Sequence, residues 1–201
     1  MRTIRMSGLV TALAALISCV PSESVNPLSD PNGAKADARL EGLWVGQDPD
    51  GDTHFFHFIH KESGTADLVL VIPDGKDGAG VLHYDFFTTV LDGSSYMNLR
   101  AKSSPDPLNA PYTTAPAYIF AKYEIAKDGS LTIGYMDDEL VKKAIDAESL
   151  DGITEGKVRI TATTDKLAAF VRSADVSKLF VDMGTFRKLE MPVSAAPDPA
   201  R

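Results

Sequence analysis

Apolar and polar residues alternate along much of the chain between residues 53 and 136, with the period of two that is typical of half-buried β-strands. Between Ala117 and Ile125, for example, one face carries only apolar or aromatic residues, while the other carries Tyr118, Phe120, Lys122 and Glu124. The β-branched and aromatic content of these runs also favours strands. The pattern predicts six of them, over Thr53–His60, Ala66–Ile72, Val81–Leu91, Tyr96–Ala101, Ala117–Ile125 and Leu131–Met136.

Asp-Gly dipeptides lie between several of these runs: Asp50-Gly51, Asp92-Gly93 and Asp128-Gly129. Tight hairpin turns require positive φ angles, which glycine adopts at little steric cost. Hairpins between successive strands predict an antiparallel meander rather than parallel strands joined by helices.

The pattern changes after residue 136 to the spacing of amphipathic helices. Asp137-Asp138-Glu139 supplies a cap and negative charge to a first helix, and a second begins near Thr164-Asp165. Val176, Leu179 and Phe180 repeat the helical spacing as a short separate turn. Strands are predicted over residues 157–163 and 185–189, the latter closing the sheet. The fold class is therefore mainly β (α+β), an antiparallel meander of eight or nine strands with two helices near the C-terminal end.

Two short motifs at the ends of this meander resemble the signature of lipocalin-like (calycin) β-barrels. Gly42-Leu43-Trp44 opens the first strand, and Arg187 lies in the last. The resemblance implies a closed barrel in which Trp44 seals one end and Arg187 packs across its ring as a cation–π contact. The helix expected between the late strands departs from the lipocalin pattern. An open sheet covered by the two helices, with Trp44 as an ordinary core residue, is the alternative.

The N-terminus has the organisation of an export signal. Arg2 and Arg5 precede an apolar run over residues 8–17, which ends in Leu16-Ile17-Ser18-Cys19. The run is too short to span a bilayer, which takes about 20 apolar residues. The order of residues resembles the lipobox of bacterial lipoproteins, in which the cysteine is acylated and becomes the mature N-terminus. By the sorting rule of that class, Val20 after Cys19 implies the outer membrane.

These features divide the chain into a signal peptide (1–18), a tether rich in Pro, Ser, Asn, Asp and Gly (19–38), one β-rich domain (39–190) and a loose tail (191–201). A loop over residues 102–115, with three prolines, interrupts the meander. Loops of this length are often functional, and they are also often insertions without a function.

Charge narrows the choice of partners. The chain carries a net charge of −8 and has no run of three basic residues, whereas a nucleic-acid-binding protein needs a basic patch for phosphates. An anionic membrane surface would repel this domain. Attachment to a membrane is therefore expected through the lipid on Cys19, and nucleic acid is not expected as a partner.

Residues with catalytic or metal-binding chemistry do not form a recognisable motif. His54 and His60 share one strand face but lie about 20 Å apart, too far to share a metal ion. The acidic run from Asp48 to Asp52 lacks the Gly and Glu of a calcium loop and is interpreted as a hairpin turn. The sequence predicts no catalytic residues, no metal and no cofactor.

Binding is then the function that the residues favour. If the sheet closes, its aromatic side chains either fill the interior or line a cavity for one small apolar or amphipathic ligand. The candidate lining residues are Phe56, Phe58, Tyr84 and Phe86. An accessory role in a cell-envelope assembly, through an exposed sheet face or the 102–115 loop, is the alternative, and a hydrolase with a non-standard site is a third.

Overall fold

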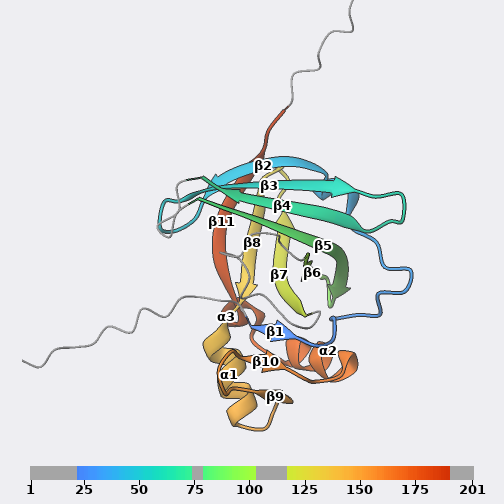
Figure 1. Cartoon of the computed structure of the whole chain (residues 1–201), viewed down its shortest axis with the longest axis vertical. Coiled ribbons are helices and arrows are strands. Elements are labelled where there is room, and N and C mark those ends of the chain that lie inside the picture. The colour runs from blue at the N-terminus through green and yellow to red at the C-terminus, as the bar shows by residue number, and fades with distance from the viewer. Residues whose placement is uncertain (1–21, 74–78, 103–116, 191–201) are drawn as a thin grey trace, which may run out of the picture.

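Eight antiparallel strands form a closed barrel (Figure 1) in the computed structural model, which describes residues 22–73, 79–102 and 117–190. The strand order around the barrel is β2-β3-β4-β5-β6-β7-β8-β11, and β11 returns to pair with β2. The bounds are β2 Gly42–Gln47, β3 Thr53–His60, β4 Ala66–Ile72, β5 Gly80–Leu91, β6 Ser94–Ala101, β7 Tyr118–Ile125, β8 Leu131–Met136 and β11 Phe180–Lys188. The predicted fold class and meander are confirmed, and the barrel is compatible with a lipocalin-like fold.

Closure depends on β11, which pairs with β8 on one side and β2 on the other. A closed barrel leaves none of its eight strands with unpaired backbone groups along an edge. The open sheet considered as an alternative is therefore wrong.

Hairpin turns hold successive strands in register, and the turn between β5 and β6 illustrates the local chemistry. Asp92 and Gly93 have φ angles of 49° and 81°, the two positive values that a two-residue hairpin turn demands. Leu91 and Ser94 are paired directly across this turn, and the register continues without a break to Tyr84 and Ala101.

Two hydrophobic cores share the barrel wall. The first fills the barrel with inward side chains from every strand, among them Trp44, Phe56, Phe58, Phe86 and Phe186. The second lies outside the barrel and joins Tyr96, Phe120 and Phe180 to the helices. This arrangement explains why β7 has apolar side chains on both faces: Ala121 and Tyr123 belong to the first core, and Phe120 to the second.

A small helical unit forms the second core and lies against the lower part of the barrel in Figure 1. It consists of α1 Asp138–Asp146, β9 Gly152–Ile153, β10 Arg159–Ile160, α2 Thr164–Ser173 and α3 Val176–Leu179. The Asp137 carboxylate caps α1 by accepting a hydrogen bond from the backbone N–H of Leu140 at 2.8 Å. Three helices replace the two predicted, because the short turn after α2 is a helix of its own.

The strand predicted over residues 157–163 is largely wrong. Only Arg159–Ile160 pairs, and it pairs with β1 (Glu23–Ser24) and β9 rather than inside the barrel wall. Its apolar residues Ile160 and Ala162 are nevertheless buried, because they face the second core.

The segment predicted as a tether departs most from the sequence-based prediction. From Ser22 onward the chain is packed: β1 pairs with β7 and β10, and Leu28 is 1% exposed in the second core. The backbone N–H of Leu28 donates to the buried Asn98 side chain at 2.7 Å. Ala38–Leu40 forms a 3-10 helix whose Leu40 enters the barrel core. Residues 22–38 thus belong to the folded domain, while residues 19–21 lie outside the described ranges.

Candidate functional site: the barrel cavity

One end of the barrel is sealed by Trp44. Its indole is 2% exposed, and Nε1 donates a hydrogen bond to the carbonyl oxygen of Leu40 at 2.7 Å. The ammonium of Lys188 lies over the ring, 5.3 Å from its centroid. Arg187, expected in this position, is exposed on the opposite face of β11. Side chains alternate along a strand, so that Lys188, which pairs with Trp44, shares its face and Arg187 does not.

Gly42 makes room for this contact. Its φ angle is 114°, and a Cβ atom at this position would lie 2.8 Å from Cε of Lys188. Glycine at the first position of the Gly-x-Trp motif thus accepts the positive φ angle and leaves space for the lysine stem beside the Trp44 ring.

Aromatic rings fill the next layer of the barrel. The ring centroids of Phe58 and Phe86 lie 5.5 Å apart in an edge-to-face arrangement, and those of Phe56 and Phe186 lie 4.7 Å apart in the same way. Such pairs are stabilised by the ring quadrupole beyond the area that they bury. Phe58 and Phe86, two of the four candidate lining residues, are thus part of the packed interior and do not belong to the cavity lining given below.

A cavity of about 170 Å³ lies in the remaining part of the barrel interior. Among the described residues, its wall consists mainly of aliphatic and aromatic side chains from β3 to β8. The candidates Phe56 and Tyr84 belong to this wall. The other wall residues are Glu23, Leu68, Leu70, Ile72, Leu82, Met97, Leu99, Ala101, Ala117, Ile119, Ala121, Ile133 and Tyr135.

Several of these residues lie at strand ends away from Trp44: Ile72 ends β4, Ala101 ends β6, and Ala117 precedes β7. The mouth of the cavity is therefore at the end of the barrel opposite the Trp44 seal. The loop predicted over residues 102–115 lies outside the described residues apart from Lys102.

Glu23 is a charged side chain in this otherwise apolar wall. Its side chain is 8% exposed, and its Oε1 accepts a hydrogen bond from Nζ of Lys157 at 2.5 Å. The adjacent Ser22 hydroxyl donates to Asp138, and burial raises the pKa of that carboxyl. Glu23 could not be predicted as a wall residue from the sequence, because its partner lies 134 residues away and the segment lacks any strand-like pattern.

The strand histidines do not converge on one centre. His54 is 6% exposed, and its Nε2 lies 3.1 Å from Oδ2 of Asp48, whereas His57 is exposed on the other face. His54 is therefore a buried, paired residue. Asp48 also accepts hydrogen bonds from the backbone of Asp50 and Asp52, as in the predicted acidic hairpin turn. Within the described ranges, no cluster of three or more His, Cys, Asp or Glu residues is arranged to hold a metal ion.

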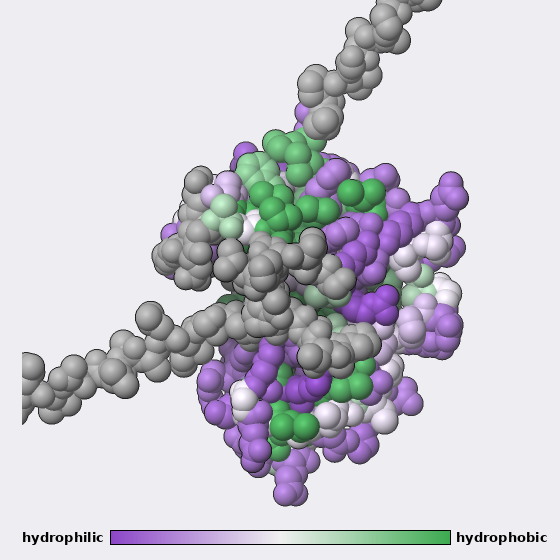
Figure 2. All heavy atoms as spheres, viewed as in Figure 1, coloured by the Kyte–Doolittle hydropathy of each residue, from purple (hydrophilic) through white to green (hydrophobic). Residues whose placement is uncertain are grey.

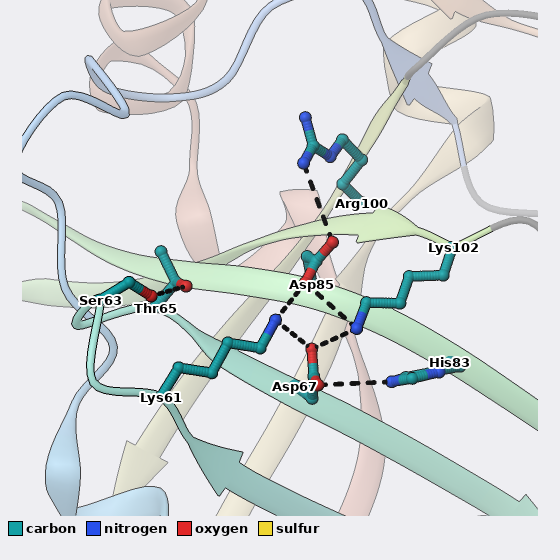
Figure 3. A network of polar contacts seen from close by, with 8 residues as sticks. All are labelled: Lys61, Ser63, Thr65, Asp67, His83, Asp85, Arg100 and Lys102. Carbon is teal, nitrogen blue, oxygen red and sulfur yellow. Dashed lines mark hydrogen bonds and ion pairs between the residues drawn. The ribbon is translucent and has the colours of Figure 1, made fainter.

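A network of charged residues crosses the outer face of β4, β5 and β6 (Figure 3): Lys61, Asp67, His83, Asp85, Arg100 and Lys102. Asp67 and Asp85 are directly opposite in the β4–β5 register, an unfavourable pairing of like charges. Lys61 lies 2.5 Å from both carboxylates and Lys102 lies 2.6 Å from Asp67, which offsets the repulsion.

These contacts also shift protonation. Burial raises the pKa of Asp67, but hydrogen bonds from Lys102 and Lys61 outweigh it and hold the pKa well below its ordinary value of 3.8. The network lies on the outside of the barrel, away from the cavity, and its geometry is that of a structural clamp between neighbouring strands.

None of the helices in the described part of the chain is both long enough and apolar enough to cross a membrane. Comparison of the chain with models of protein families finds no match, and comparisons with curated proteins and with solved structures find none that is significant.

Proposed function

We propose that this protein is an acylated lipoprotein of the bacterial cell envelope, held at the outer membrane and facing the periplasm, whose barrel binds a small apolar or amphipathic molecule without converting it. The cavity carries this proposal, and the lipobox at Cys19 supports the location. The sequence contains no recognisable catalytic motif, which favours binding over an enzymatic role.

The size and lining of the cavity define the class of ligand. An apolar protein cavity of about 150 Å³ is known to hold a benzene molecule, so the space here suits a single ring or one short aliphatic segment. Transfer of such a group from water into this wall is favourable by about 25 cal/mol for each Å² of apolar surface removed from water. Glu23, which is paired with Lys157, supplies charge at the wall for a polar end group.

A blocking substitution tests the proposal. Ala121 is 1% exposed and belongs to the cavity wall, so Ala121→Phe places a ring into the space that a ligand would take. The matched control is Ala126→Phe, at an exposed position beyond the end of β7. We expect octanoic acid, titrated calorimetrically into the Cys19→Ala protein, to bind the parent and the control but not Ala121→Phe. Native mass spectra without a retained apolar molecule, together with no heat of octanoate binding to the parent, would refute ligand binding.

A second function, as an accessory subunit of an envelope assembly, is favoured by the outer surface. Val45, Phe55, Val71 and Val81 are paired in one row across β2 to β5 on the outside of the barrel. Figure 2 shows apolar surface over this part of the sheet, and Val81 is 55% exposed. Crosslinking in the native envelope through a photoreactive residue at position 81 tests this role. A specific partner that is lost in Phe55→Asp supports it, and crosslinks to the bulk of envelope proteins alone contradict it.

A further inference from the structure

The packed N-terminal segment fixes how far the domain can lie from its anchor. Ser22 is 1% exposed and Glu23 is 6% exposed, so the folded domain extends at least to Ser22, three residues after Cys19. A fully extended chain covers at most about 3.6 Å per residue, which places Ser22 within about 11 Å of the Cys19 Cα atom. A free tether through residue 38 would instead have reached about 70 Å when extended.

The chain enters the fold at the cavity. Glu23 belongs to the cavity wall, and its neighbour Ser24 pairs with Tyr118, the residue after the wall residue Ala117. Figure 1 shows β1 beside the barrel at its junction with the helical unit. An anchor at Cys19 therefore holds the mouth side of the barrel, rather than the Trp44 end, close to the bilayer.

Exposed apolar side chains lie close to the mouth of the cavity. Val25 is 46% exposed and follows Glu23 by two residues, and Val81 is 55% exposed and adjoins the wall residue Leu82. Val181 is 52% exposed and is the cross-strand partner of the wall residue Tyr135. These are three of the seven large apolar residues that stay exposed in the described part of the chain. Their position suits contact with an apolar medium at this end of the barrel.

We infer that the cavity mouth faces the membrane to which Cys19 is attached, and that its ligand is the end of one acyl chain of a bilayer lipid. This inference rests on the proposed function. The end of the acyl chain passes from the bilayer into the apolar cavity without exposing its methylene groups to water. No soluble carrier is therefore needed to deliver this ligand. The cavity volume restricts occupancy to one short segment of one chain rather than a whole lipid.

Site-specific fluorescence tests the orientation. Cys19 is the chain's single cysteine and is consumed by acylation, so an introduced cysteine can be labelled uniquely. The acylated protein carrying Val81→Cys or Val181→Cys is labelled with an environment-sensitive dye and reconstituted into phosphatidylcholine vesicles with brominated acyl chains. The matched control is Val90→Cys, which is 67% exposed and lies about 26 Å farther along β5 from Leu82.

We expect the bromines to quench the labels at positions 81 and 181 several-fold more strongly than the label at position 90. Insertion of about 20 Gly and Ser residues between Pro21 and Ser22, with a root-mean-square length of about 25 Å, should reduce the quenching at 81 to that at 90. Equal quenching at all three positions, or no effect of the insertion, would overturn the inference. Octanoate binding by the Cys19→Ala protein separates the two claims: binding without selective quenching refutes the orientation alone, whereas no binding refutes the proposed function itself.

Discussion

Leu28 gives the sharpest test of the packed N-terminal segment, because the sequence places it in a tether and the structure places it in a core. Its side chain is 1% exposed among the residues of the second hydrophobic core. Substitution of a fully buried leucine by alanine costs about 2–5 kcal/mol, from lost apolar burial and from the cavity left behind. A leucine in a solvated tether would cost less than about 0.5 kcal/mol.

We expect Leu28→Ala to lower the free energy of unfolding by about 3 kcal/mol. For a domain of this size, that loss corresponds to a fall of about 6–12 °C in Tm. Val25→Ala is the matched control, since Val25 lies three residues earlier in the same segment but is 46% exposed. Its free energy of unfolding should stay within about 0.5 kcal/mol of the parent.

Urea unfolding of the Cys19→Ala protein, followed by circular dichroism and by the emission of Trp44, measures both variants. The two signals should change together if the barrel and the helical unit unfold as one cooperative domain. Equal stability of Leu28→Ala and Val25→Ala, within about 0.5 kcal/mol, would contradict the packing of residues 22–38 and with it the short distance between anchor and cavity.

Two further predictions concern charged residues of the barrel. Lys188→Met should lower the free energy of unfolding by about 0.5–1 kcal/mol and shift the emission of Trp44, the chain's single tryptophan, because the cation above the ring is lost. Arg187→Met, on the outer face, should leave the emission unchanged, and the opposite ranking would restore the expected role of Arg187. Asp67→Asn should cost about 1 kcal/mol at pH 7. Since the folded-state pKa of Asp67 is depressed, its contribution is present above the unfolded value of 3.8 and is lost as pH falls through the folded value. Urea unfolding at pH 7 and below pH 4 should therefore show a shrinking difference between parent and variant, and a difference that grows on acidification would contradict the clamp.

The strand bounds could be predicted closely because their cause is local. In Thr53–His60, Ala66–Ile72 and Leu131–Met136, side-chain alternation and flanking turns specify the strand through residues close together in the chain, and the structure gives the same bounds. The strand predicted over 157–163 failed because Val158, Ile160 and Ala162 alternate equally well in an irregular segment that covers a core. Alternation of apolar and polar residues indicates that one face of a segment is buried, but it does not show whether a neighbouring strand pairs with that segment.

The candidate site was predictable only in part. Phe56 and Tyr84 could be proposed because they are aromatic residues of predicted strands, although alternation alone did not reveal which face of the β5 strand points inward. Whether an inward ring borders a cavity or packs against another ring depends on its layer in the barrel, as Phe58 and Phe86 show. The cation over the Trp44 ring is Lys188 rather than the predicted Arg187, because Lys188 is the residue paired with Trp44. A shift of one residue along a strand moves a side chain to the opposite face.

The sequence by itself determined the antiparallel meander, its turns, the charge that disfavours nucleic acid and the lipobox hypothesis, because each depends on residues close together in the chain. Only the tertiary structure decided that the sheet closes, where the cavity lies and that the expected tether is a packed strand and core segment. Those features depend on contacts across long separations, such as Glu23 with Lys157 and Leu28 with Asn98. Pairings of that kind leave no periodic trace, since the favourable burial and hydrogen bonding arise only when the whole chain has folded.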